Sequence, residues 1–134
     1  MTRYDQMEWP DIDPAYIEQW PILANWKATG ADSFGCIRFH RFIEVSDPSL
    51  MARLYLIQGA NWHRIGIEVR HERFGVATCD DIGVKATCSE AELSAAWSAH
   101  IDGVVADVQQ QYQEWCEEID REYDLAEQRR ARHQ

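Results

Sequence analysis

The chain has 134 residues, of which 46% are hydrophobic, and a formal net charge of −10. This length fits one domain with a buried core, and the composition argues against wholesale disorder. The excess of acids argues against a general nucleic-acid binder, because phosphate contacts need lysine and arginine. The charge is uneven: it is −4 over residues 1–33, +1 over 34–88 and −7 over 89–134.

The first eleven residues contain no apolar run, so we expect neither a secretion signal nor a membrane span. The four cysteines lack the close spacing, such as CxxC, that zinc sites normally show. They are Cys36, Cys79, Cys88 and Cys116. We therefore expect a cytoplasmic protein with free thiols and with neither a metal nor another cofactor.

Residues 1–33 are expected to form a helical N-terminal segment. Asp13 followed by Pro14 is typical of a helix N-cap and a first helical position. Pro21 either kinks this helix or begins a second one, which Gly30 ends.

Residues 34–88 are expected to form an antiparallel sheet of four or five strands, because the hydrophobic period changes to two. Apolar residues alternate over 37–45, interrupted by Arg41, and more regularly over 63–70. The segment 47–58 is either a helix capped by Asp47 or a strand over 53–58, and we favour the strand because both connections are then short. The similar segments 75–79 and 83–88 flank an Asp-Asp pair, which predicts a hairpin.

Residues 89–132 are predicted to form a long amphipathic helix. Ser89 and Glu92 begin it with a capping box. Apolar residues then recur every eleven positions on three tracks, which together keep an apolar stripe on one face. The tracks are Leu93, Val104, Trp115 and Ala126; Trp97, Val108 and Ile119; and Ile101, Tyr112 and Tyr123.

The length of this helix presents two alternatives. Unbroken, it would measure about 60 Å, whereas a compact chain of this size is about 35 Å across. The helix therefore either breaks or bends near Gly103, or it extends past the sheet. An apolar stripe past the sheet would need a second chain, for example in a homo-oligomer formed through this helix.

The other faces of the helix are strongly acidic. Three like-charged pairs lie four residues apart, each costing about a few tenths of a kcal/mol, and only Glu117 and Arg121 attract each other at that spacing. The charges are thus not arranged to stabilise the helix. They form either a solvated face or a surface for a basic partner.

The expected fold is α+β in one domain over 1–134: short N-terminal helices, the antiparallel sheet, and the long C-terminal helix packed on it. For function we expect a non-enzymatic protein-binding module, either a chaperone or an inhibitor of the anti-defence or immunity type. Its partner would be a protein with a basic surface, for example one that binds nucleic acid, and not nucleic acid or a membrane directly. Candidate anchors are Trp62 and Trp115, and the charge would come from Glu114, Glu117, Glu118, Asp120 and Asp124.

An alternative function is the binding of a small anionic ligand in a pocket between the sheet and the long helix, because guanidinium groups suit phosphate or carboxylate. The candidate residues are Arg38, His40, Arg64 and Arg70, unless these arginines pair with acids such as Glu68. A third and weaker alternative is a hydrolase or nuclease that uses His40 or His63. No motif such as GxSxG or HExxH supports it.

Overall fold

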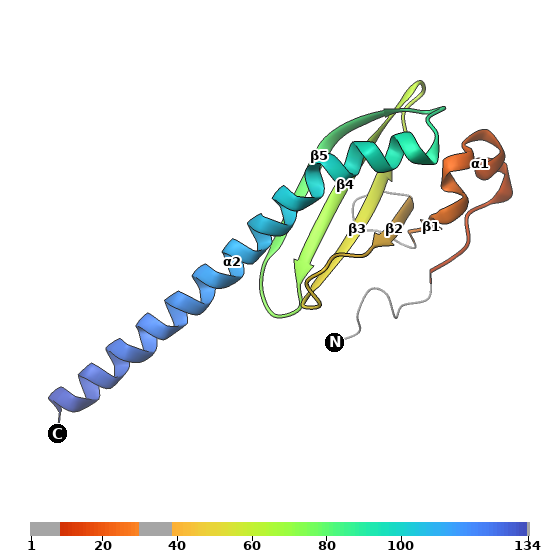
Figure 1. The fold of residues 1–134 in the computed structure, drawn as a ribbon. Coiled ribbons are helices and arrows are strands. Elements are labelled where there is room, and N and C mark those ends of the chain that lie inside the picture. The colour runs from red at the N-terminus through yellow and green to blue at the C-terminus, as the bar shows by residue number, and fades with distance from the viewer. Residues whose placement is uncertain (1–8, 30–38, 134) are drawn as a thin grey trace.

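The computed structural model describes residues 9–29 and 39–133. Two short helices and five strands precede one long helix (Figure 1). In chain order these are α1 (Pro14–Gln19), the 3₁₀ helix η2 (Pro21–Asn25), β1 (Lys27–Ala28), β2 (Phe39–Ile43), β3 (Leu50–Ile57), β4 (Trp62–His71), β5 (Val76–Lys85) and α2 (Glu90–Arg132).

The strands form one antiparallel sheet in the order β1-β2-β3-β4-β5, so each strand pairs with its neighbours in sequence. The predicted α+β fold with an antiparallel sheet and a long C-terminal helix is therefore confirmed. The favoured strand within 47–58 is also confirmed, as β3. Asp47 still accepts a hydrogen bond from the amide of Ser49, 2.9 Å away, but within the turn that leads into β3.

The inner face of the sheet, which α2 covers, is apolar. Leu54 pairs with Ile67 and Leu56 pairs with Ile65 across β3 and β4, and none of these four side chains is exposed. Because side chains alternate between the faces of a strand, every second residue of β3 and β4 points into this core.

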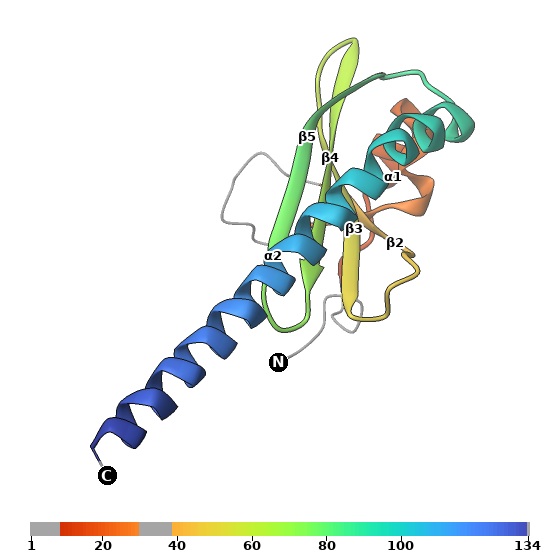
Figure 2. The same cartoon turned by 60° about the vertical axis from the view of Figure 1, so that its left-hand side comes forward.

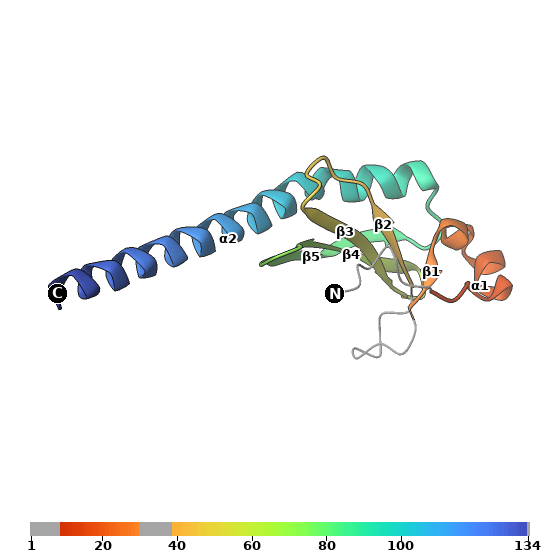
Figure 3. The ribbon, with the colours of Figure 1, turned by 90° about the horizontal axis from the view of Figure 1, so that it is seen from below.

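Helix α2 lies across the inner face (Figures 2 and 3). It buries Leu93, Val104 and Val108 in the core. The N-terminal elements cover the end of the same face near the start of α2. There the ring of Tyr16 meets that of Phe39, with centroids 5.5 Å apart.

One expectation for the strands is wrong. The hairpin predicted over 75–88 is a single strand, β5, with a bulge. Ile67 pairs with Cys79 and Ile65 with Ile82, so Gly66 alone stands opposite two aspartates, Asp80 and Asp81. The extra residue shifts the alternation by one, and the apolar residues on both sides of the bulge still face the core.

The second N-terminal helix is shorter than expected. It ends at Asn25, and Trp26 has extended backbone torsions. Lys27 and Ala28 then form β1 by pairing with β2, where Lys27 lies opposite His40.

Candidate protein-binding surface on the C-terminal helix

Helix α2 is continuous from Glu90 to Arg132, with Ser89 and Glu92 in the predicted capping box. Gly103 does not break it, although Figures 1 and 3 show a change of direction between its first turns and the rest. The helix therefore does not break; it changes direction and also extends past the sheet, so the two alternatives for its length do not exclude each other.

Aromatic pairs hold α2 where it leaves the sheet. The rings of His71 and Tyr112 stack with centroids 3.8 Å apart and an angle of 14° between their planes. The rings of Phe74 and Trp115 stack at 5.0 Å and 18°. His71 ends β4 and Phe74 lies in the turn to β5, so this turn fixes the direction of the helix.

The backbone beside the same turn also bonds to a side chain of the helix. The side-chain amide of Gln111 accepts a hydrogen bond from the N–H of Val76 and donates one to its carbonyl, at 3.3 Å and 3.1 Å. Gly75, which directly precedes Val76, has a φ of 108°. A Cβ at Gly75 would lie 3.3 Å from the side chain of Val108. Glycine thus allows both the left-handed turn and the close approach of α2.

Beyond this contact α2 projects from the molecule. Every residue from 117 to 132 is exposed, and we call this segment the helical arm. At 1.5 Å per residue it is about 24 Å long. It carries three exposed large apolar side chains, Ile119 (41% exposed), Tyr123 (64%) and Leu125 (50%).

All five acids predicted to bind a partner are exposed on α2, in the arm or just before it. They are Glu114, Glu117, Glu118, Asp120 and Asp124. Three of them make contacts along the helix: Glu114 with Gln110, Glu117 with Gln113, and Glu118 with Arg121 at 2.6 Å. Arg121 therefore pairs with the acid three residues before it rather than with Glu117 as expected.

The two candidate anchors lie at opposite ends of the sheet. Trp115 is half-buried against Phe74, beside the arm. Trp62 is 57% exposed at the start of β4, and His71 at the other end of that strand is about 30 Å away at 3.3 Å per residue. Trp62 instead lines a hollow of about 210 Å³ with Lys85, Cys88 and others near the beginning of α2. It therefore lies apart from the acidic surface.

Three of the four predicted anion-binding residues lie on the outer face of the sheet, away from α2. His40, Arg64 and Arg70 share this face by strand register, and Arg38 lies outside the described residues. A pocket between sheet and helix lined by these side chains is therefore wrong, because the alternation of the strands directs them to the opposite side.

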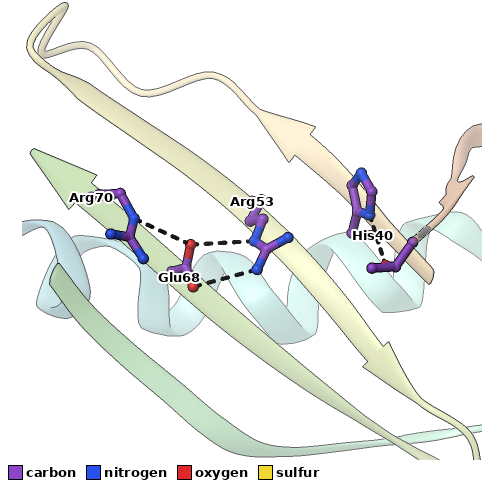
Figure 4. Close-up of polar contacts among 5 residues, drawn as sticks. His40, Arg53, Glu68 and Arg70 are labelled. Atoms are coloured by element: carbon purple, nitrogen blue, oxygen red, sulfur yellow. Dashed lines mark hydrogen bonds and ion pairs between the residues drawn. The ribbon is translucent and has the colours of Figure 1, made fainter. Parts of the chain in front are cut away.

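A carboxylate already lies among the arginines of this outer face (Figure 4). Oε1 of Glu68 forms ion pairs with both arginines. It lies 3.3 Å from Nε of Arg53 and 3.7 Å from Nε of Arg70. Glu68 thus offsets the positive charge that an anionic ligand would need. This agrees with the alternative given above, in which the arginines pair with acids such as Glu68.

His40 is completely buried on this face. Its Nδ1 lies 2.9 Å from the hydroxyl of Thr29. The rings of His40 and Trp9 meet edge-to-face, with centroids 4.4 Å apart. Burial, with a smaller contribution from the charge of Arg53, lowers the pKa of His40 from 6.5 to about 4. His40 is therefore neutral near pH 7.

His63 is also almost completely buried, and burial lowers its pKa. Its Nδ1 accepts a hydrogen bond from the N–H of Gly59 at 3.1 Å, and its ring meets that of Trp20. Both histidines named for hydrolysis thus have structural neighbours and little access to solvent.

The described part of the chain contains no group of three or more His, Cys, Asp or Glu side chains placed to hold a metal ion. Cys79, Cys88 and Cys116 are free thiols, and Cys36 lies outside the described residues. Over the same residues, no helix has the length and hydrophobicity needed to cross a membrane.

Sequence reasoning missed two residues of the arm region. Leu125 belongs to none of the three apolar tracks, so the periodic pattern did not single it out, and it is 50% exposed. Phe74 gave no signal, because a single aromatic residue in a turn belongs to no periodic pattern. No family model, curated protein or solved structure matches this chain.

Proposed function

We propose that the chain is a non-enzymatic protein-binding module, an inhibitor or a chaperone, whose helical arm engages a basic protein surface. One observation carries the proposal: the most acidic part of the chain is also a helix that projects from the sheet with exposed apolar side chains. A helix that served only to cover the sheet would have no need of the arm.

The two kinds of side chain have different roles in this proposal. The acids steer a basic partner toward the arm and raise the rate of association. Tyr123 and Ile119 then bury apolar area against the partner, as aromatic and aliphatic anchors do at protein interfaces. The stacked pair of Phe74 and Trp115 fixes the angle at which the arm is presented.

A salt-dependent pull-down with a charge variant tests the proposal. The variant replaces five acids by their amides, Glu114→Gln, Glu117→Gln, Glu118→Gln, Asp120→Asn and Asp124→Asn. The wild-type chain is expected to recover a basic partner from lysate at about 50 mM salt and to lose it at about 500 mM, since exposed charges are screened within a few ångströms at high salt. The variant should recover at least tenfold less at low salt.

A matched variant controls for net charge. It replaces five exposed acids outside residues 114–124 by their amides. These are Glu18, Glu72, Asp80, Asp102 and Asp107. It should bind the partner as the wild type does. If both variants lose the partner equally, or neither does, the acidic surface of α2 is not the binding site.

We further propose that the protein works in the cytoplasm. The free thiols of the three described cysteines support a reducing compartment. Blocking of all four cysteines by a thiol reagent in freshly lysed, denatured cells would agree with this, whereas disulfides in that sample would contradict it.

A further inference from the structure

The helical arm carries charges of opposite sign in two separate segments. Residues 117–124 hold five acids and one arginine, and residues 129–132 hold three arginines and no acid. All of these side chains are exposed. The ion pairs of the arm join neighbours on the helix, Arg121 with Glu118 and Arg130 with Glu127. The arm therefore has a negative half and a positive end, both open to another molecule.

We propose that the arm pairs in antiparallel orientation with the arm of a second copy of this chain, centred near Leu125. In that orientation the negative half of each arm lies beside the positive end of the other. A parallel pair would place acids beside acids and arginines beside arginines, which is unfavourable. The layout of charge thus selects both the occupant and its direction.

The register follows from residues seven apart on the same side of the helix. Glu118, Leu125 and Arg132 have this spacing, so they follow one line along the arm. An antiparallel pair centred on Leu125 sets Glu118 opposite Arg132 of the partner at both ends and brings the two Leu125 side chains together. Asp120 likewise lies opposite Arg130, and Arg121 opposite Arg129 is the one unfavourable match.

A second line of residues along the arm has the spacing of a coiled-coil contact. Ile119, Glu122, Ala126 and Arg129 recur at alternating intervals of three and four, the pattern of the contact line in a two-stranded coiled coil. In the register above, Glu122 lies opposite Gln128 of the other copy, and Arg129 makes the unfavourable match with Arg121 already named. The exposed ring of Tyr123 borders this line and meets its counterpart near the centre.

The interface would be small. Each arm offers about four helical turns, an area typical of transient contacts below about 1,200 Å². We therefore expect a dimer that forms at micromolar concentration or above and weakens with salt. This inference goes beyond the proposed function, because no other protein takes part and the purified chain alone tests it.

The test is sedimentation velocity on the full chain at about 10 to 200 µM. At about 50 mM salt the wild type should be largely dimeric at the upper concentration, and at about 500 mM salt its dissociation constant should rise at least tenfold. Glu118→Arg and Arg132→Glu, each alone, should be monomeric, because like charges then meet at both ends. Circular dichroism confirms that each variant keeps the helix.

Charge exchange makes the test specific for the antiparallel register. An equimolar mixture of the Glu118→Arg and Arg132→Glu chains should form dimers, and so should the chain that carries both changes, because each restores opposite charges at both ends. A wild type that stays monomeric at 200 µM and low salt would overturn the proposal. A different protein would then remain as the binding partner of the arm. Dimers that persist in the single variants, or fail to return in the mixture, would also overturn it.

Discussion

His40 couples the stability of the sheet to pH. Its pKa falls from 6.5 in the unfolded chain to about 4 in the folded protein, mainly because the ring is buried. Above pH 6.5 both states are neutral there. As the pH falls from 6.5 toward 4, the unfolded chain gains a proton that the folded protein does not, so stability decreases over this window.

We therefore predict that the free energy of unfolding falls by up to about 3 kcal/mol between pH 7 and pH 4 through His40. His63 adds to the loss in the same direction, since burial lowers its pKa too. Urea unfolding at several pH values measures the effect, and His40→Gln should reduce its size. An equal slope for wild type and variant would show that His40 is not the titrating group.

A side chain at Gly66 in β4 would clash with the neighbouring strand. Gly66 lies opposite Tyr55 on β3, and a Cβ at this position would be 2.0 Å from Cζ of the tyrosine ring. We predict that Gly66→Ala lowers stability by about 1–3 kcal/mol through overpacking. Thermal or urea unfolding would measure this loss.

A second glycine of the sheet provides the control for Gly66. A Cβ at Gly83 would meet only Trp62, at an ordinary 3.8 Å, so Gly83→Ala should change stability little. Adding Tyr55→Ala to Gly66→Ala should cost less than the sum of the single changes, because the clash is then gone. Simple additivity would mean that the ring does not cause the loss at Gly66.

At the scale of the elements, periodic sequence patterns predicted where an element lies. They did not predict features that depend on pairing with another strand. The capping box and the eleven-residue tracks located α2, because both signals are local. The strand β1 has only two residues and therefore no period, and it exists because Lys27 and Ala28 meet β2. The continuity of β5 through Asp80 and Asp81 depends on a bulge opposite Gly66, which only the partner strand determines.

The same limit applied to the candidate site. The acids of α2 were found because they are contiguous in sequence and the helix carries them past the sheet. The separation of Trp62 from Trp115 depends on which end of β4 the helix starts from, and no local pattern contains that information. The outer-face position of His40 and Arg70 likewise follows from the side on which α2 packs.

Helix α2 contains a glycine that its packing does not require. Nothing lies within 4 Å of the place that a Cβ would occupy at Gly103. We predict that Gly103→Ala stabilises the protein by about 1 kcal/mol, since alanine loses less backbone entropy in a helix. Ala106→Gly, at another exposed position of the helix, should cost about as much. A loss of stability in Gly103→Ala would mean that the change of direction in α2 needs the glycine.

At the scale of the whole molecule, the arm and the sheet are separate in their contacts. The last side chains of α2 that meet the sheet region are near Trp115, and the arm beyond them is exposed throughout. We predict that a chain ending at Cys116 unfolds with a free energy within about 1 kcal/mol of the full chain's monomer, as surface changes usually do. Urea unfolding at high salt and low concentration makes this comparison. A loss well above that range would show that the arm supports the sheet.

The two proposed uses of the arm exclude each other. In the antiparallel pair the arginines of one copy cover the acids of the other, so a basic partner reaches those acids only after the pair separates. Partner binding and dimerisation then compete for one surface, and mass action links them. We predict that free protein at 200 µM and low salt is a dimer, whereas its complex with the basic partner contains one copy of the chain. Light scattering coupled to gel filtration gives both masses. A complex with two copies would show that the partner binds elsewhere, or that the arms pair through a face that leaves the acids open.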